Sequence, residues 1–187
     1  EILVLNFDAE KTDFVRFNHS KIRQAGNVNQ ATLTLNLIFK KKTLTSVIRL
    51  STDFEKDSVL LIRTLSYLRR EIPELPKDPY LMYEKNINSF EKNITGSKLD
   101  NYSITGNILD NCHAFDMVGI LSSGTIMKGF ANSLGQFNWH ESESFNFDWS
   151  MYAESGKAIK QNYSDQEWNQ EAFSNLLSES KEKLKVI

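Results

Sequence analysis

The adjacent residues His140 and Glu141 are the first place in this sequence to look for metal chemistry. A zinc-peptidase helix carries a second His one turn after the first, so that both imidazoles face the ion, and its Glu activates a water molecule. The position for that second His holds Ser144, and the next position, which a longer motif would use, holds Phe145. Because neither side chain fits and the segment alternates like a strand, we expect no metal ligand at His140.

Cys112 is the only cysteine in the sequence and therefore the only thiol nucleophile to consider. His113 follows it directly, but adjacent residues on a helix point about 100° apart, which does not suit a Cys–His dyad. Free cysteine is usually a small buried residue, so we expect Cys112 in the core and a cysteine hydrolase is the least favoured alternative. A single cysteine also excludes an intrachain disulfide and suits a reducing compartment.

No other residues form a catalytic pattern. Ser122, Ser123 and Gly124 lack the glycine–x–serine–x–glycine context of a nucleophile turn, and the chain has no glycine-rich phosphate loop. His19 stands alone in the sequence and is expected at the surface or at a cap. The residues themselves therefore predict no catalytic, cofactor-binding or metal-ligating site in this chain.

The composition is that of an ordinary folded protein without a surface for polyanions. The 187 residues are 40% hydrophobic and 25% charged, and the formal net charge is −2. Nucleic-acid-binding domains are usually basic, whereas the longest basic run here is Lys40–Lys42, which we expect in a solvated loop. No stretch approaches the roughly 20 apolar residues of a membrane span. We expect a cytoplasmic protein that contacts neither nucleic acid nor membrane.

Apolar runs near the start of the chain predict strands. Ile2–Phe7 and Phe14–Phe17 indicate two short strands separated by a polar turn. Ala31–Phe39 alternates between two faces over its whole length, which is typical of a half-buried strand. Lys40–Lys42 leads into the apolar run Leu44–Leu50, so we expect these segments to form a hairpin.

A helix is expected after this hairpin. Thr52 or Asp53 supplies its N-cap, and an apolar stripe follows at helical spacing. All three prolines lie within seven residues and predict a rigid extended connector where the helix ends. The stripe consists of Phe54, Leu61, Leu65 and Leu68, and the prolines are Pro73, Pro76 and Pro79.

The second half of the chain predicts helices at both ends of a β-rich region. The polar segment 86–103 predicts a short helix around Phe90 and then a loop at Thr95–Ser97, and Ile104–Cys112 has helical spacing. Turns are expected at Ser122–Gly124 and at Ser133–Gln136.

A long strand should follow from Phe137 to Ala153, with aromatic residues on one face that are expected to pack a core rather than line a cavity. Ser164 and Glu167 have the spacing of a capping box before a last helix. The order of elements predicts an α+β fold of antiparallel β-sheets with flanking helices. The Pro-containing connector divides it into a β-hairpin/helix subregion, residues 1–80, and a helix-plus-sheet subregion, residues 81–187.

A series of short motifs between Phe115 and Asn169 resembles the amino-terminal region of the TldD/PmbA family. These motifs, in order, are Asp116, Val118-Gly119-Ile120, Ser123-Gly124, Lys128-Gly129, Asn132-Ser133-x-Gly135 and Trp149-Ser150. The upstream residues are similar too, with Arg16, Phe17, Ser20, Ile22 and Gln24 in one pattern and Leu75-Pro76-x-Asp78-Pro79 in another. The match covers most of the chain, and its weakest part is residues 86–103.

The resemblance implies the amino-terminal domain of a longer, two-domain intracellular protein. Members of this family are described as zinc-dependent peptidases or modulators of DNA gyrase, and they work as dimers of identical or related subunits. Their zinc motif lies in the carboxy-terminal half, where we expect the zinc, so no catalytic residue is carried over to this chain. The motif residues expected at a substrate or subunit interface are Arg16, Asp116, Ser123, Gly124, Gly129, Asn132, Ser133 and Gly135.

Two functions follow as hypotheses. In the first, the chain is a non-catalytic domain that forms one wall of a dimer cavity and holds unstructured peptide, with open strand edges giving affinity by β-augmentation. In the alternative, it is a stand-alone, non-enzymatic peptide-binding or scaffold protein without a zinc-bearing half.

Overall fold

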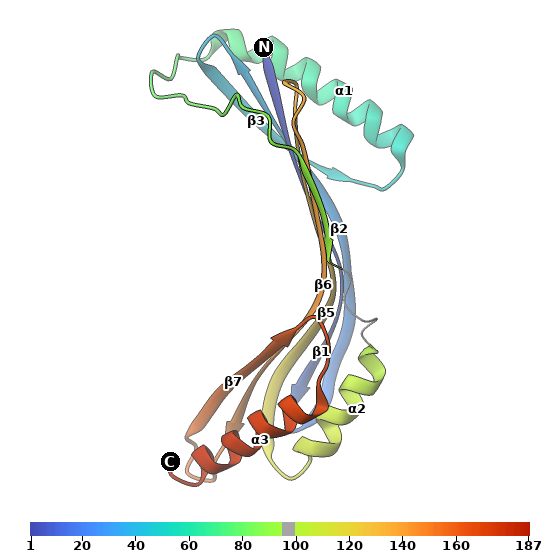
Figure 1. Cartoon of the computed structure of the whole chain (residues 1–187), viewed down its shortest axis with the longest axis vertical. Coiled ribbons are helices and arrows are strands. Elements are labelled where there is room, and N and C mark those ends of the chain that lie inside the picture. Colours follow the sequence, from blue (N-terminus) through green and yellow to red (C-terminus); the bar gives the residue numbers. More distant parts are fainter. Residues whose placement is uncertain (95–99) are drawn as a thin grey trace. The chain divides into compact units, whose positions relative to one another are not determined.

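The computed structural model describes residues 1–94 and 100–187. Over these residues the fold is α+β, as predicted, with a seven-stranded sheet, three α-helices and one short 3-10 helix (Figure 1). The elements are β1 (Ile2–Asn18), β2 (Lys21–Phe39), β3 (Lys42–Leu50), α1 (Phe54–Glu71), η1 (Ile72–Glu74), β4 (Phe90–Ile94), α2 (Asn101–Cys112), β5 (Asp116–Asn132), β6 (Phe137–Tyr152), β7 (Ala158–Asp165) and α3 (Gln170–Leu184).

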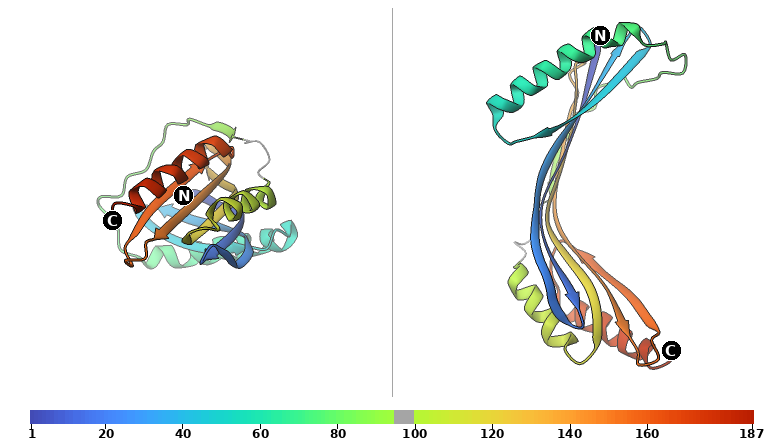
Figure 2. Two further views of the ribbon diagram at one scale, coloured as in Figure 1. Left: turned by 90° about the horizontal axis from the view of Figure 1, so that it is seen from below. Right: turned by 180° about the vertical axis from the view of Figure 1, so that it is seen from behind.

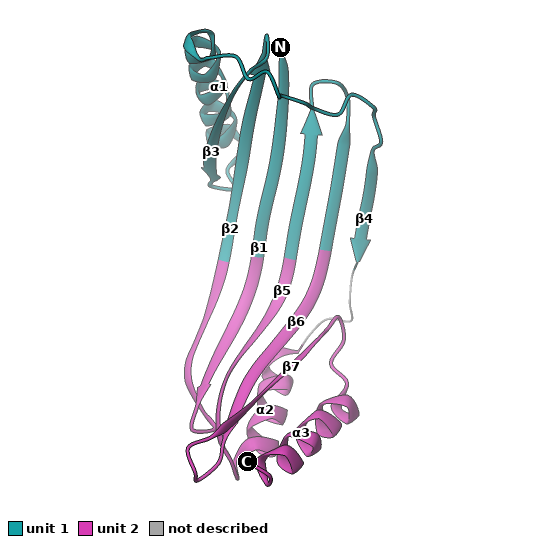
Figure 3. Cartoon of the chain, turned by 90° about the vertical axis from the view of Figure 1, so that its left-hand side faces the viewer, with its two compact units in different colours: residues 1–10, 29–94, 126–141 teal, residues 11–28, 95–125, 142–187 magenta. Residues whose placement is uncertain are grey.

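The strand order is β3-β2-β1-β5-β6-β4, and β7 also pairs with β6. The described residues form two compact units (Figure 3). Unit 1 comprises residues 1–10, 29–94 and 126–141, and unit 2 comprises residues 11–28, 100–125 and 142–187. Strands β1, β2, β5 and β6 contribute residues to both units, so the units are interleaved in sequence and do not follow a single division near residue 80.

The predicted hairpin of unit 1 is confirmed. Strands β2 and β3 pair antiparallel from Ala31–Leu50 to Phe39–Lys42. Lys40 and Lys41 make the two-residue turn, with φ angles of 48° and 65°. This left-handed conformation matches the twist of the two strands, which is why such turns connect hairpins.

Helix α1 begins at the predicted cap. The side chain of Asp53 accepts a hydrogen bond from the backbone N–H of Lys56 at 3.3 Å, and the carboxylate of Asp57 accepts one from the backbone N–H of Ser51 at 2.9 Å. The side chain of Lys56 also binds Asp53 and lowers the pKa of its carboxyl, while the Ser51 backbone N–H lowers the pKa of Asp57. The Lys56 bond satisfies a donor that the start of a helix leaves free, and the Ser51 bond ties the residue before the cap to the first turn.

The core of unit 1 is aliphatic. Leu68 of α1 and Ile72 of η1 are buried together with Leu35, Leu37 and Ile48 of the hairpin, and Figure 1 shows α1 lying along the hairpin strands. The predicted apolar stripe is confirmed for the three residues that pack on this core, Leu61, Leu65 and Leu68. The fourth member, Phe54, is 84% exposed at the first turn.

The core of unit 2 is aromatic. Helices α2 and α3 cover one face of its sheet (Figure 2), and the side chains beneath them come from alternate positions of the strands. The rings of Phe147 and Trp149 stack with centroids 4.6 Å apart, and Phe173 of α3 meets Trp149 edge-on at 6.0 Å. The prediction that aromatic residues of this strand pack a core is confirmed for Phe145, Phe147 and Trp149.

The start of helix α3 corrects the predicted capping box. The helix begins after Asn169, whose side chain accepts a hydrogen bond from the backbone N–H of Ala172 at 2.9 Å. Ser164 instead lies in β7, opposite Asn146. Pairing with β6 keeps this residue in the sheet, so the local capping pattern is overridden by the strand.

Two further local predictions are wrong. The polar residues between Phe7 and Phe14 make no turn, because Asp8 pairs with Lys128 of β5 and Glu10 accepts a hydrogen bond from Gln30 of β2, which keeps β1 in the sheet. Residues around Phe90 form strand β4 rather than a helix. The predicted loop at residues 95–97 lies outside the described residues.

The turn expected at Ser122–Gly124 is also wrong, because β5 runs through these residues without a break. Gly124 has a φ of 155°, and a Cβ added there would lie 2.7 Å from the Cα of Thr12 on β1. The glycine therefore marks a close approach of two strand backbones, which the sequence does not distinguish from a turn.

Candidate functional site

A cleft of about 560 Å³ lies on the unit 2 sheet. Its exposed and half-buried residues alternate along β5 with buried residues of the core: Val118 and Ile120 line the cleft, whereas Met117 and Leu121 are buried. Two core residues, Phe17 and Trp149, also border it. Because successive side chains of a strand point to opposite faces, the cleft belongs to the face that α2 and α3 leave uncovered. It is lined by Arg16, Phe17, Asn18, Arg23, Gln24, Val118, Gly119, Ile120, Asp148, Trp149, Ser150 and Lys160.

Gly119 lines the cleft and lies against the ring stack of the core. A Cβ added to this glycine would lie 3.0 Å from the backbone oxygen of Asp148 and 3.1 Å from the ring of Phe147. A side chain at this position would therefore press on the stacked rings of the core. The valine and isoleucine on either side point the other way and give the cleft an apolar lining.

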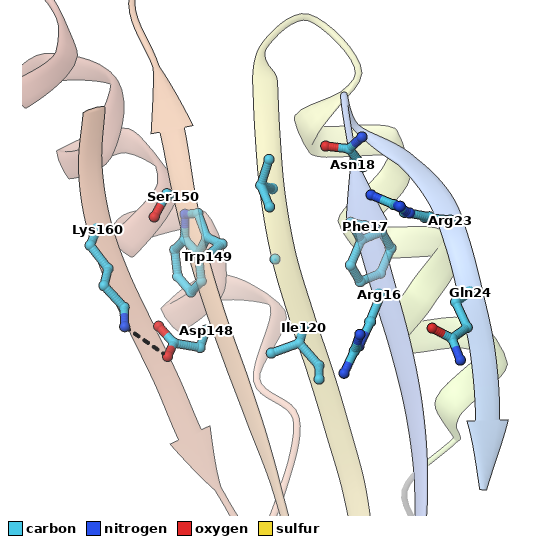
Figure 4. A pocket seen from close by; sticks show the side chains of 12 residues that line it. Arg16, Phe17, Asn18, Arg23, Gln24, Ile120, Asp148, Trp149, Ser150 and Lys160 are labelled. Carbon is cyan, nitrogen blue, oxygen red and sulfur yellow. Dashed lines mark ion pairs between the residues drawn. The ribbon is translucent and has the colours of Figure 1, made fainter. Parts of the chain in front are cut away.

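The cleft has more positively than negatively charged side chains. Arg16, Arg23 and Lys160 supply three cations, and Asp148 supplies the only carboxylate (Figure 4). The Nζ of Lys160 lies 3.1 Å from the Oδ2 of Asp148, so this pair neutralises itself. The Oδ1 of Asp148 is buried and has no hydrogen-bond partner among the described residues, an arrangement that costs free energy.

The two arginines are not neutralised in the described part of the chain. Neither Arg16 nor Arg23 forms an ion pair with residues 1–94 or 100–187; the guanidinium of Arg16 lies 5.9 Å from the centre of the Phe14 ring. Both side chains are exposed. Figure 4 shows them rising from neighbouring strands β1 and β2, with Ile120 between Arg16 and Asp148. A guanidinium presents several N–H donors in one plane and suits a carboxylate or phosphate.

An unpaired strand edge borders the cleft. The β2–β3 ladder begins at Ala31, so in unit 2 the described strands leave residues 21–28 of β2 with β1 as their only neighbour. Six of these eight residues are exposed. Since Arg23 and Gln24 belong to this segment, the edge and the cleft share residues.

A second cleft of about 580 Å³ lies in unit 1 and is aromatic rather than cationic. The rings of Phe7 and Trp139 stack at 5.5 Å, and both are half-buried. Gly129 lies against this pair, since its added Cβ would meet each residue at 3.2 Å. His140 also lines the cleft.

Metal binding is not supported at His140 by its surroundings. Within residues 1–94 and 100–187, no three His, Cys, Asp or Glu side chains are close enough together to hold a metal ion. The described residues therefore form no zinc site. The family resemblance implies zinc only for the carboxy-terminal half of such proteins.

Cys112 is fully buried, as expected for a core residue. Burial raises the pKa of its thiol to about 11. The Nδ1 of the neighbouring His113 lies 2.6 Å from the backbone oxygen of Asp110 on its own helix, so it makes a capping contact. The arrangement gives no support to a cysteine nucleophile.

Four of the predicted interface residues stabilise unit 1. Asn132, Ser133 and Gly135 build the turn between β5 and β6, which was predicted at this place. The side chain of Asn132 accepts hydrogen bonds from the backbone N–H groups of Leu134 and Gln136 at 3.0 and 3.1 Å. The Ser133 hydroxyl accepts one from Leu3 at 3.1 Å, Gly135 has a φ of 104°, and Gly129 contacts the ring pair described above.

The other four lie in unit 2, and only one of them lines the cleft. That residue is Arg16. Asp116 binds the Nδ1 of His19 at 2.7 Å at the exposed end of β5. The hydroxyl of buried Ser123 donates to the side chain of Asn101 on α2, and Gly124 permits the close approach to β1. A substrate or interface role for these residues stays a prediction.

The sequence motifs do not include Arg23, Asp148 or Lys160, although these residues line the cleft with Arg16. They come from three different strands, β2, β6 and β7. Only Asp148 had a local signal, because it alternates with Phe147 and Trp149 on an amphipathic strand. The convergence of all four charges depends on the pairing of strands.

No helix within residues 1–94 and 100–187 is both long and apolar enough to cross a membrane.

Neither a protein-family model nor a curated protein matches this chain. Solved structures do. TldE from Thermococcus kodakarensis has 13% sequence identity to this chain and a TM-score of 0.65, with 99% of this chain and 44% of that chain covered.

Two proteins provisionally described as DNA gyrase modulators have the same fold. The one from Thermotoga maritima is 11% identical with a TM-score of 0.67, and 96% of this chain and 43% of that chain are covered. The one from Bacteroides thetaiotaomicron is 10% identical with a TM-score of 0.66, and the coverages are 98% and 44%. The predicted resemblance is thus confirmed at the level of the fold, and this chain spans less than half the length of each of these structures.

Proposed function

We propose that this chain is the non-catalytic amino-terminal domain of a TldD/PmbA-like protein, and that it holds unstructured peptide for a zinc-dependent peptidase centre elsewhere in the protein or its partner. Three structures with this fold support the first part, because each extends well beyond the region that this chain covers.

The observation that supports the peptide-holding role is the edge of β2 at residues 21–28, which has no strand partner within residues 1–94 and 100–187. A strand edge presents a row of free backbone N–H and C=O groups, to which an extended peptide can add as a further strand. Such binding depends on the peptide backbone and gives little sequence preference. The neighbouring cleft would receive side chains that point from the added strand toward the uncovered face.

Backbone methylation tests this mode directly. In an edge-bound strand, alternate peptide N–H groups bind the edge and the intervening ones face outward. Fluorescence anisotropy with the whole chain should show a loss of roughly ten-fold for peptides N-methylated at one set of alternate positions, and little change for the other set. Equal effects of both sets, or no binding of any unstructured peptide, would remove the proposal.

A dimer with an identical or related TldD/PmbA-like subunit is part of the same proposal, as is a cytoplasmic location. Purification of the protein from its native source should recover a second chain or a second copy together with zinc. Sedimentation as a metal-free monomer, with no zinc-peptidase motif encoded in the same reading frame, would instead favour a stand-alone peptide-binding or scaffold protein.

A further inference from the structure

We propose that the cleft on the unit 2 sheet selects carboxylate-bearing peptides, with Arg16 and Arg23 as the groups that bind the carboxylate. This inference rests on the proposed peptide-holding function and adds a chemical preference to it. The shared chemistry is a carboxylate, which an extended peptide offers either from an Asp or Glu side chain or from its own carboxyl terminus.

The first argument is the local excess of positive charge. The cleft has three cations and one carboxylate, whereas the whole chain has a formal net charge of −2. The pairing of Lys160 with Asp148 leaves the two arginines as the unneutralised cations of the site. A carboxylate placed between them would gain charge-assisted hydrogen bonds, and an amide of the same shape would gain weaker ones.

The second argument is the position of the two guanidinium groups. Arg16 is on β1, and Arg23 is on the segment of β2, residues 21–28, whose outer edge has no partner among the described strands. A peptide added to that edge would lie one strand spacing, roughly 4.8 Å, from β2 and two from β1. Side chains of such a strand that point to the uncovered face can therefore reach both guanidinium groups.

The third argument concerns the rest of the cleft, which disfavours a highly charged ligand. Val118 and Ile120 give the cleft an apolar lining, and Figure 4 shows Ile120 between Arg16 and Asp148. A ligand with a single carboxylate next to an apolar group matches this lining, because the carboxylate can bind the arginines while the apolar group contacts Val118 and Ile120. A polyphosphate or nucleic-acid strand would bring further negative charge toward Asp148 and the apolar lining.

Matched peptides and variants test the preference. Peptides that differ only by Glu or Gln at one position, each with a free or an amidated carboxyl terminus, separate the two sources of the carboxylate. Binding of the preferred acidic peptide to the whole chain should weaken roughly ten-fold in each of Arg16→Gln and Arg23→Gln, and should weaken with added salt. Arg63→Gln, which removes an exposed arginine from α1 in unit 1, is the matched control and should change nothing.

Asp148→Asn should change the affinity for acidic peptides in the opposite direction. It releases Lys160 from its ion pair, so acidic peptides should bind several-fold more tightly, a gain that misfolding does not produce. Equal affinity for Glu and Gln peptides at both ends, with normal binding to the arginine variants, would overturn the carboxylate preference and leave peptide binding intact. A failure of all peptides to bind would instead overturn the proposed function itself.

Discussion

In unit 2, Gly119 lies against the stacked rings of Phe147 and Trp149; in unit 1, Gly129 lies against the stacked rings of Phe7 and Trp139. The unit 2 pair is 0% and 1% exposed, whereas the unit 1 pair is half-buried and lines a cleft. The same local arrangement thus serves a core in one unit and a surface in the other.

What differs is the helical cover. Phe173 of α3 packs on both rings of the unit 2 pair, at 6.0 Å from each. Helix α1 of unit 1 packs on aliphatic residues of β2 and β3 instead, and the cluster that it covers does not include Phe7 or Trp139. A stacked ring pair beside a glycine therefore becomes part of a buried core only where a helix covers the rings with an apolar side chain, as Phe173 does in unit 2.

Truncating one ring in each unit should give the largest difference between them. Phe147→Ala should lower the free energy of unfolding by about 3–5 kcal/mol, because it removes a fully buried ring from a close-packed cluster. Trp139→Ala should cost clearly less, since its ring is already partly in water. Urea denaturation followed by circular dichroism measures both; equal losses would contradict the contrast between core and surface.

Alanine substitutions at two glycines of unit 2 test how closely the strand backbones of its sheet approach one another. Gly124→Ala should destabilise unit 2 by about 1–3 kcal/mol, because its Cβ would overlap the backbone of β1. Gly106, on helix α2 of the same unit, is the control: an added Cβ there meets nothing within 4 Å. Gly106→Ala should be neutral or should add up to about 1 kcal/mol of helix propensity. Thermal unfolding should show a lower melting temperature for Gly124→Ala and an unchanged or slightly higher one for Gly106→Ala, and a loss of stability in both variants would contradict the assignment.

The sequence predicts elements well where the pattern is local. The alternation of Ala31–Phe39, the lysine turn, the Asp53 cap and the Ser133–Gln136 turn all need only a few adjacent residues, and the structure has them, with the lysine turn formed by Lys40 and Lys41. It fails where long strands impose their own pairing. Gly124 looks like a turn residue, but it lies within β5 because β1 passes close beside it.

The candidate site could be predicted only in part, for the same reason. Arg16 belongs to a sequence motif, but no local pattern in the sequence places it near Lys160, which is 144 residues away. The strand order β2-β1-β5-β6-β7 brings the charges of the cleft onto one face. Several motif residues, Asn132 and Ser133 among them, instead have clear structural roles in a turn.

Acid should affect the helix starts of the two units differently. Asp57 at the start of α1 has a lowered pKa because the backbone N–H of Ser51 binds its carboxylate, whereas α3 is capped by Asn169, which does not titrate. A lowered folded-state pKa stabilises the fold above the unfolded value, near 3.9, and this contribution is lost as the pH falls through the folded value.

Asp57→Asn should therefore flatten the fall in melting temperature between about pH 5 and pH 2, with a small effect at pH 7. Amide exchange can assign the change to α1, and Asn169→Asp, which introduces a titrating cap on α3, is the converse variant. An unchanged pH profile in Asp57→Asn would show that the Ser51 contact does not favour the ionised carboxylate.

The thiol of Cys112 gives the smallest expected effect and the clearest test of how well the unit 2 core is closed. Its pKa is raised to about 11 by burial, so the reactive thiolate is a very small fraction at neutral pH. Modification by iodoacetamide should be slow, and its rate should still rise with pH at pH 10, where an exposed cysteine with a pKa near 8.5 is already almost fully ionised. Phe147→Ala should speed the reaction because it loosens the cluster that contains Cys112, whereas Trp139→Ala in unit 1 should leave the rate unchanged. Rapid labelling of the unaltered protein at pH 8 would mean that this core opens often, and the comparison between a closed aromatic core and an open aromatic cleft would then fail.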